Sequence, residues 1–387
     1  MIKDVGAVPT VTASGRATRV RLLSNPVKDY AWGSRSDLAA LTGRPVPAPG
    51  PEAEMWLGTH PAGPSLLAGD GRSLADVVGA DPLGQLGPAT VARHGERLPY
   101  LMKLIAVAQP LSLQVHPSAE QAAEGHARGV YVDPWPKPEL VCALTPFTAL
   151  AGFRSAGQAA MLLARLCVPA LEDVVSLLEA GSPVAALRAL LERPEMVEQV
   201  VWAASAVHHP DYDLVVRLAR RHPGDPACLA PLLLRRHDLA PGEALFLGAG
   251  VLHCYLDGFG VEIMGSSDNV VRAGLTAKPV DVEELLRVLD PGAIPLPVEA
   301  RDGVYVTPSP EFRLRRVAVD GEVPLDGGLP RILLCVEGRV RADTLDLRAG
   351  ESAFVPATHP PVTLSGYGLV FCAEPGPADQ PGVRAAR

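Results

Sequence analysis

The chain of 387 residues has no long hydrophobic run, few aromatic residues and no paired cysteine motif. No apolar stretch approaches the roughly 20 residues that a membrane-spanning helix needs. The first twenty residues lack the sustained apolar core of a signal peptide. The six cysteines are scattered and form no CxxC pair, which is typical of reduced thiols rather than of a disulfide framework or a cysteine-based zinc site. These absences predict a cytoplasmic protein with no membrane partner.

Positive charge is also scarce, and lysine is the scarcer of the two basic residues. The net charge of −8 argues against a nucleic-acid or anionic-membrane partner. Of the 35 basic residues only five are lysines, and Lys103, Lys137 and Lys278 lie in or beside the motifs described below. Lysine supplies a compact ammonium and a tunable proton donor that arginine does not replace. We therefore expect these three lysines to be functional.

The organisation of the chain follows from its hydrophobic periodicity. Short apolar runs separated by Gly and Pro indicate a β-sandwich or barrel, interrupted by short helices near 73–95 and 118–129. Ala- and Leu-rich sequence with apolar residues three or four apart then indicates helices, before strands resume. The predicted division is a flexible arm (1–18), a discontinuous barrel (19–154 plus 237–292), a helical insertion (155–236), a C-terminal strand-rich unit (293–375) and a disordered tail (376–387).

A faint internal repeat relates the two strand-rich units. When residues 240–255 are aligned with 348–363, a glycine, a glutamate, a phenylalanine and an alanine coincide, and His253 falls on Pro361. If the repeat is real, the chain holds two related barrels and the second has lost the histidine. Generic turns followed by hydrophobic strands would give the same pattern, because such short motifs match by chance.

Three separate segments carry the donors of one candidate metal site. Gln114 and His116 lie in LSLQVHPS, Glu139 in KPEL and His253 in GAGVLHCY. On a strand, Ser112, Gln114 and His116 share one face and the intervening apolar residues the other. Two imidazoles, a carboxylate and an amide oxygen suit zinc, with room for a water or a substrate oxygen. Each segment alone also fits a buried histidine, a solvated strand face or a proline-stiffened loop.

The neighbours of these donors add detail to the candidate site. Prolines on both sides of Lys137 hold it extended, so that Lys137 and Glu139 share a face and the ammonium could act as an acid. His253 begins a strand with Tyr255 on the same side. Cys254 points to the opposite face and is therefore a poor candidate ligand for the same metal.

The segment GVEIMGSSDNVVRAGLTAKPVD is too polar for a core strand. Its Arg272, Gly274 and Lys278 combine bidentate hydrogen bonding, close backbone approach and a point charge, which are the requirements of a phosphate monoester. The alternative is a polar loop with solvated cations. Aromatic residues are sparse but gather in YAWGS and EMWLGTHP, where they predict either one wall of a sugar pocket or core packing: Tyr30, Trp32 and Trp56, with His60.

In combination, QVHPS, KPEL, the turn before His253 and SSDNVVRAGLTAK resemble the motifs of type I mannose-6-phosphate isomerases (phosphomannose isomerases). YAWGS and EMWLGTHP resemble the amino-terminal motifs of that family. The resemblance covers most of residues 20–290, and DNVVRAGLT is its most specific part. It implies a mainly β fold with an α insertion: two cupin-type jelly-roll barrels, the second without metal, plus a helical domain.

The resemblance also implies an activity, a cofactor and roles for residues. The activity is the interconversion of mannose 6-phosphate and fructose 6-phosphate by proton transfer through an enediol(ate), with one zinc ion per chain, in carbohydrate metabolism and GDP-mannose biosynthesis. The implied zinc ligands are Gln114, His116, Glu139 and His253. The implied catalytic residues are Arg272, Lys137, Asp268 and Glu262, and the candidate substrate or phosphate ligands are Lys278, Ser112, Lys103, Trp32 and Tyr255.

The chain departs from the family pattern at two motifs. Many members read N-H-K-P-E where this chain reads W-P-K-P-E, so a role for that histidine does not transfer. Gly248 replaces the usual proline of the turn before His253, which should loosen that turn. Rival hypotheses are an iron-dependent cupin oxidoreductase, a non-catalytic sugar-phosphate sensor and an epimerase. The expected partner is a small sugar phosphate, and the expected state is a monomer or weak homo-oligomer.

Overall fold

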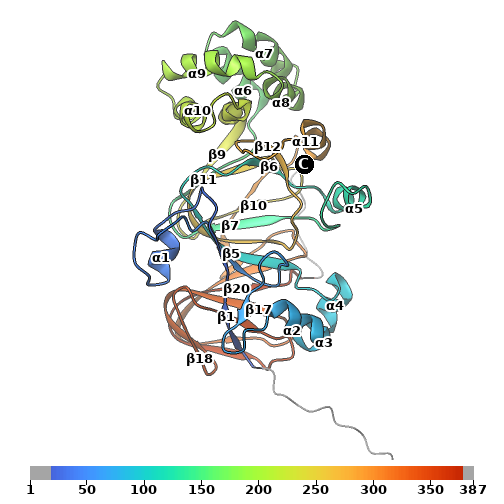
Figure 1. The fold of residues 1–387 in the computed structure, drawn as a ribbon, viewed down its shortest axis with the longest axis vertical. Coiled ribbons are helices and arrows are strands. Elements are labelled where there is room, and N and C mark those ends of the chain that lie inside the picture. The colour runs from blue at the N-terminus through green and yellow to red at the C-terminus, as the bar shows by residue number, and fades with distance from the viewer. Residues whose placement is uncertain (1–18, 378–387) are drawn as a thin grey trace, which may run out of the picture.

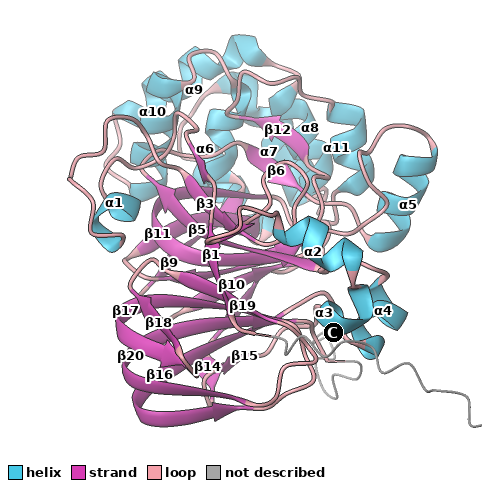
Figure 2. Ribbon diagram, turned by 60° about the horizontal axis from the view of Figure 1, so that its bottom comes forward, coloured by secondary structure: helices cyan, strands magenta, loops and turns pink. Residues whose placement is uncertain are grey.

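The computed structural model describes residues 19–377, so the predicted arm (1–18) and nearly all of the predicted tail lie outside the described residues. Two antiparallel sheets are stacked along the long axis, and a group of helices covers one end (Figure 1 and Figure 2). The chain is mainly β with an α insertion, as the sequence predicts. Among residues 19–377, no helix combines the length and the hydrophobicity needed to cross a membrane. All six cysteines are free.

The eleven-stranded sheet holds the candidate site and is organised around one long strand, β11 (His253–Gly265), which pairs with four others. Because β11 begins at His253 and passes through Glu262, it carries two predicted site residues into the middle of the sheet. The other strands are β13 (Leu296–Val298), β10 (Ala244–Leu247), β7 (Glu139–Ala143), β5 (Tyr100–Val107), β3 (Glu54–Leu57), β2 (Val27–Lys28), β6 (Leu113–Val115), β12 (Val271–Gly274), β8 (Phe147–Phe153) and β9 (Leu234–Leu239).

The nine-stranded sheet is built mainly from the C-terminal part of the chain. Its strands are β14 (Ala300–Arg301), β15 (Val304–Tyr305), β16 (Arg313–Leu325), β20 (Val362–Glu374), β17 (Arg331–Ala342), β18 (Leu345–Arg348), β19 (Ser352–Val355), β1 (Arg21–Ser24) and β4 (Leu66–Leu67). The aligned repeat segments fall on β10 and β19. Each of these strands follows a glycine with positive φ, Gly242 (91°) and Gly350 (85°), which explains why glycine is kept in both turns.

Three strands lie outside the predicted domain boundaries. β1 and β4 come from the segment assigned to the first barrel, but β1 pairs with β19 and thereby protects an edge of the C-terminal sheet. β13 comes from the segment assigned to the C-terminal unit, but it pairs with β10 in the first sheet. Pairings between segments so distant in sequence depend on which sheet edges are left open, and hydrophobic periodicity does not record that.

The helical insertion contains α6 (Ala156–Ala164), α7 (Glu172–Glu179), α8 (Pro183–Leu191), α9 (Val197–Ser205) and α10 (Pro210–Arg221), with the short 3-10 helices η1 (Pro169–Leu171), η2 (Pro194–Met196) and η3 (Pro226–Leu232). It begins where Ser155 caps α6 by accepting the Gln158 N–H. The insertion ends slightly before the predicted boundary at 236, because β9 begins at Leu234. In the sequence, the two exposed arginines Arg235 and Arg236 are typical of the solvent-facing side of a helix, which moved the predicted boundary past the start of β9.

The insertion is packed firmly on the first sheet. Buried residues of its helices, such as Leu163 and Leu218, belong to the same apolar core as Leu113 of β6 and Val271 of β12. A second core, which includes Tyr100 of β5 and Phe371 of β20, joins the two sheets. Burial of this much apolar surface makes the three parts a continuous scaffold on which site residues from distant segments hold fixed positions.

The remaining helices lie beside the sheets. α2 (Leu74–Ala80), α3 (Pro82–Leu86) and α4 (Pro88–His94) fall in the first segment predicted to hold short helices, and α5 (Ala119–Ala127) falls in the second. These two predictions are confirmed. α1 (Asp37–Leu41) and α11 (Val282–Val288) complete the set.

Candidate metal and substrate site

Strand pairing brings the predicted metal donors together from three directions. Gln114 lies on β6, His253 is the first residue of β11, and these two residues are direct partners in the ladder. Glu139 is the first residue of β7, and His116 follows β6 by one residue. The Gly250 N–H donates to the His116 carbonyl oxygen at 3.0 Å, so the turn before His253 is intact despite Gly248.

The donor atoms converge on one buried point. His116 Nε2 lies 3.1 Å from Glu139 Oε1, and His253 Nε2 lies 3.4 Å from Glu139 Oε2. The ligand atoms of these three residues all lie within 4.8 Å of one another. Gln114 Nε2 lies 3.4 Å from His253 Nε2, while Gln114 Oε1 accepts a hydrogen bond from Ser112. Cys254 faces away, with its Sγ 3.0 Å from the Leu111 carbonyl oxygen.

The protonation of the two imidazoles shows that the site fits a cation. His116 Nδ1 lies 2.9 Å from the Asn269 carbonyl oxygen and His253 Nδ1 lies 2.9 Å from the Val251 carbonyl oxygen. Each Nδ1 therefore carries a proton, and in the neutral form of each ring the Nε2 lone pair faces an acceptor-only carboxylate. His116 Nε2 is buried and has no hydrogen-bond partner among the described residues. A cation placed between the two Nε2 atoms and the carboxylate would satisfy all three acceptors.

The electrostatic surroundings keep these donors in metal-binding form. Burial lowers the pKa of His116 to about 4, against a smaller opposing effect of Glu139, so this imidazole is neutral at physiological pH. Burial alone would raise the pKa of Glu139, but Lys137 and His116 outweigh it and hold that pKa well below its ordinary value. Lys137 Nζ lies 3.1 Å from Glu139 Oε1. The site thus offers a neutral imidazole at His116 and a charged carboxylate at Glu139.

A cavity of about 530 Å³ opens over the donor cluster and is large enough for a sugar phosphate. His116 and His253 lie behind its wall, each 1% exposed. All other predicted site residues line it: Trp32, Lys103, Ser112, Gln114, Lys137, Glu139, Tyr255, Glu262, Asp268, Arg272 and Lys278. The aromatic segments contribute Tyr30, Trp32 and Trp56 to one wall, and the Tyr30 and Trp32 rings lie 5.8 Å apart.

Lys103 is held between two buried carboxylates at the floor of the cavity. Its Nζ lies 3.1 Å from Glu262 Oε2 on β11 and 3.5 Å from Glu54 Oε1 on β3. Burial would lower the pKa of Lys103, but Glu262 and Glu54 raise it well above its ordinary value. Burial raises the pKa of Glu262 in spite of Lys103. Two carboxylates thus face the charge of Lys103, and its role as a phosphate ligand stays a prediction.

Replacing Lys103 with methionine should lower the free energy of unfolding by about 3–5 kcal/mol, because it leaves Glu54 and Glu262 buried without their cation. Urea unfolding at neutral pH measures this loss. Lys28→Met is the matched control, since Lys28 also lies over Trp56 (4.3 Å to the ring centroid) but pairs with no carboxylate among the described residues. Equal stabilities of the two variants would show that the buried pair has no structural role.

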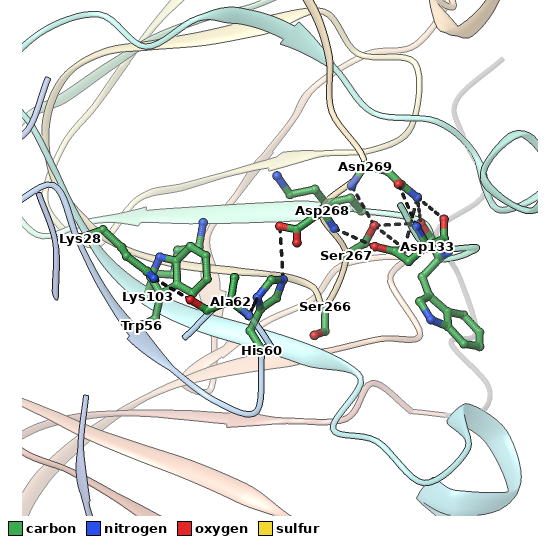
Figure 3. Close-up of polar contacts among 12 residues, drawn as sticks. Lys28, Trp56, His60, Ala62, Lys103, Asp133, Ser266, Ser267, Asp268 and Asn269 are labelled. Atoms are coloured by element: carbon green, nitrogen blue, oxygen red, sulfur yellow. Dashed lines mark hydrogen bonds and ion pairs between the residues drawn. The ribbon is translucent and has the colours of Figure 1, made fainter. Parts of the chain in front are cut away.

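Asp268 is held in place by His60, as Figure 3 shows. His60 Nδ1 accepts the Ala62 N–H at 3.3 Å, so the proton of the neutral ring is on Nε2, which lies 3.3 Å from Asp268 Oδ1. His60 is buried and packs edge-on against Trp56, whereas the Asp268 side chain is 45% exposed to the cavity. The hydrogen bond from His60, with weaker contributions from Lys137 and Lys103, lowers the pKa of Asp268.

A second set of contacts fixes the backbone around Asp268. The Asp133 carboxylate accepts the Asp268 N–H at 2.9 Å and the Ser267 hydroxyl at 2.8 Å, and the Asn269 amide donates to the Asp133 carbonyl oxygen at 2.7 Å (Figure 3). Asn269 in turn presents the carbonyl oxygen that orients His116. The polar run that the sequence marks as unusual is therefore a structural clamp on both the metal site and the cavity wall.

Trp135, the first residue of the W-P-K-P-E motif in which this chain departs from the family pattern, has a structural contact. The Arg97 guanidinium lies over its ring, 3.9 Å from the centroid, and donates to the Ser266 carbonyl oxygen at 3.0 Å. Trp135 thus helps to fasten the segment that carries Lys137 to the segment that carries Asp268.

Sequence reasoning missed three ionisable residues of the cavity: Glu54, Arg221 and His222. Glu54 lies in the EMWLG motif but only its aromatic neighbour attracted notice, because the need for a carboxylate becomes visible only when β3 pairs with β5. Arg221 and His222 lie at the end of α10, in sequence that reads as an ordinary amphipathic helix, and no motif marks them as site residues.

Comparisons with known proteins point to one family. The family profile "Phosphomannose isomerase type I, catalytic domain" matches residues 20–156. The mannose-6-phosphate isomerase of Escherichia coli (strain K12) is 36% identical over 381 residues, covering 89% of this chain and 97% of the relative. The human mannose-6-phosphate isomerase is 33% identical over 411 residues, covering 92% of this chain and 93% of the relative.

Solved structures agree with the sequence comparisons. A lysine-to-alanine variant of phosphomannose isomerase from Salmonella typhimurium matches with a TM-score of 0.86 and 33% identity, covering 93% of this chain and 100% of that chain. A mannose 6-phosphate isomerase bound with zinc and yttrium matches with a TM-score of 0.84 and 32% identity, covering 92% and 100%. These likenesses confirm the predicted fold class of two cupin-type barrels with a helical insertion.

Proposed function

Because the chain belongs to the type I phosphomannose isomerase family, we propose that the cavity above the metal donors is the active site of a mannose-6-phosphate isomerase. The enzyme interconverts mannose 6-phosphate and fructose 6-phosphate by moving a proton between C1 and C2. The observation that carries this assignment is the convergence of two imidazole nitrogens and a carboxylate beneath a cavity lined by acids, bases and cations.

The metal is zinc, and His116, Glu139 and His253 would hold it, one ion per chain. Gln114 would be the fourth ligand through its amide oxygen, which rotation of the amide by half a turn would place where Nε2 now faces His253. Bound zinc supplies Lewis-acid polarisation of the oxygens at the reacting carbons.

The proton transfers fall to groups that line the cavity. Lys137 is the proposed acid or base, because its ammonium is buried and held only 3.1 Å from Glu139. Asp268 is the proposed partner for ring opening, since its carboxylate is ionised, oriented by His60 and open to the cavity. Glu262 lines the floor as a further proposed acid, and burial raises its pKa in spite of Lys103, which favours its protonated form.

Arg272 is the proposed stabiliser of the negative charge that develops on the enediol(ate). It lies on β12 directly opposite Gln114 in the ladder, and so beside the metal donors. Lys278, on the loop after β12, is the proposed phosphate ligand, with Ser112 as a further hydrogen-bond donor and Trp32 and Tyr255 forming the walls.

We further propose that the enzyme acts in the cytoplasm as a monomer or weak homo-oligomer with a sugar phosphate as its partner. Five of the six free cysteines are buried, an arrangement that suits a reducing compartment.

A coupled assay of fructose 6-phosphate formation from mannose 6-phosphate tests the proposed function. The purified chain should turn over at a rate in the range of about 1–1,000 s⁻¹, typical of enzymes. Oxygen consumption measured in the same reaction should be absent. Saturable sugar-phosphate binding without turnover would favour a sensor instead, and oxygen consumption with bound iron would favour a cupin oxidoreductase.

A further inference from the structure

The helical insertion reaches the active-site cavity. α10 ends at Arg221, and both Arg221 and His222 line the same cavity as Arg272 and Lys278. The other helices of the insertion share one apolar core with β6 and β12, and, within the described part of the chain, none of their residues lines the cavity. The end of α10 is therefore the part of the insertion that meets the substrate space.

A carboxylate of the insertion fastens the loop that follows β12. Asp225 Oδ2 accepts the Leu275 N–H at 2.6 Å, while its Oδ1 accepts the Ala227 N–H at 2.9 Å and so caps η3. Leu275 has a φ of 55°, a left-handed conformation that costs free energy unless contacts hold it. The hydrogen bond from Leu275 to Asp225 is such a contact, and it lies three residues before Lys278.

The fit between the loop and the insertion is close. At Gly274, whose φ is 142°, an added Cβ would lie 2.3 Å from Ala227 Cβ and 2.8 Å from Asp225 Oδ1. Only glycine leaves room for the insertion at this point. The position of loop 274–278 is therefore set by the insertion as well as by the barrel.

The charges at this end of the cavity are unbalanced. Within residues 19–377, none of the ion pairs involves Arg221, Arg272 or Lys278, although Lys103 and Lys137 in the same cavity are both paired with glutamates. In a chain with a net charge of −8, unpaired cations gathered on one cavity form a local site for an anion. The sugar phosphate supplies a dianionic group that guanidinium binds through paired hydrogen bonds.

We propose that Arg221 of the helical insertion binds the phosphate group of the substrate, and that Asp225 is a positioning residue that sets the loop carrying Lys278. This inference rests on the proposed function. The insertion thereby completes the phosphate end of the site, while the barrel supplies the metal and the acid-base groups. Phosphorylated sugars would then be preferred over free sugars partly through a residue outside the barrel.

Arg221→Ala is expected to raise the KM for mannose 6-phosphate by about 10-fold or more, the cost of a lost hydrogen bond to a charged group, and to change kcat by less than about twofold, because the phosphate is remote from the reacting carbons. Arg221→Lys should recover part of the affinity. Arg220→Ala is the matched control, because Arg220 is the preceding residue of α10 and is exposed, but does not line the cavity.

Calorimetric titration of the zinc-loaded chain with inorganic phosphate gives a reading that does not depend on turnover. Arg221→Ala should weaken phosphate binding by a similar factor, and Arg220→Ala should leave it unchanged. If the wild-type chain binds phosphate but isomerises nothing, the proposed function fails while this inference stands. If Arg221→Ala matches Arg220→Ala in both KM and phosphate binding, the inference is wrong whatever the activity of the wild type.

Asp225 is tested through rescue. Asp225→Ala should raise KM while leaving kcat nearly unchanged. Asp225→Asn should recover part of the KM, because its single amide oxygen can accept the Leu275 N–H, although its NH2 group cannot accept the Ala227 N–H. A purely structural role would instead lower the melting temperature of both variants together with their active fraction, and would leave the KM of the folded fraction unchanged. That result would remove Asp225 from the proposal.

Discussion

Arg272→Ala is expected to lower kcat by about 100- to 1,000-fold, the usual cost of removing a group that stabilises charge developing in a transition state. Arg272 pairs with Gln114 across β6 and β12, lines the cavity and has no carboxylate partner among the described residues. Burial lowers its pKa from the ordinary value, but a guanidinium stays charged at neutral pH. Its charge is therefore available to the enediol(ate).

The measurement is steady-state kinetics with mannose 6-phosphate, together with thermal melting to show that the variant is folded. Because Arg272 is only partly buried and makes no ion pair with any described residue, melting should change little. Arg272→Lys should retain more of the turnover than Arg272→Ala, since it keeps a positive charge but loses the fixed geometry of the guanidinium. If KM rises while kcat is unchanged, Arg272 binds the ground state only, and its proposed role is wrong.

His253→Ala is expected to abolish zinc binding at stoichiometric concentrations, because only His116 and Glu139 of the three donors remain. Without zinc, turnover should fall by at least about 1,000-fold. Cys254→Ala is the matched control. Its sulfur belongs to a residue next to His253 in sequence and is also a common zinc ligand, but it points toward Leu111. Zinc content by atomic absorption and the coupled assay would be measured on both variants.

Comparing His253→Ala with Cys254→Ala shows whether the imidazole or the neighbouring thiol binds the zinc, since both residue types are common zinc ligands. If Cys254→Ala loses zinc and His253→Ala keeps it, the side chains of His253 and Cys254 point to the opposite faces of β11 from those in the structure. If both variants keep zinc, the donors lie elsewhere. The cavity left by the missing thiol should lower the stability of Cys254→Ala slightly, so melting curves must accompany the metal analysis.

The metal donors could be predicted because short-range rules place them. Alternation along β6 puts Gln114 and His116 on one face, and the flanking prolines keep Lys137 beside Glu139. The resemblance to a known family then supplied the convergence of the three segments, which no single segment implies. Turns and strand periods are local and indicate a sandwich or barrel, whereas the two-barrel fold was implied by the resemblance to the family.

What could not be predicted depends on pairings between distant segments. Glu54 becomes a site residue only when β3 lies beside β5 and presents it to Lys103. Arg221 resembles the cations that commonly end a helix and interact with its dipole, and only the packing of the insertion on β12 turns it toward the cavity. The membership of β1 in the C-terminal sheet is likewise decided by an open edge at β19.

The most direct test of the zinc-dependent isomerase is to follow zinc content and turnover in one preparation before chelation, after chelation and after zinc is restored. We expect about one zinc per chain, a loss of at least about 100-fold in turnover as the metal is removed, and recovery when one equivalent is returned. A chain that interconverts the two sugar phosphates at full rate after its metal has been stripped would contradict the proposed function.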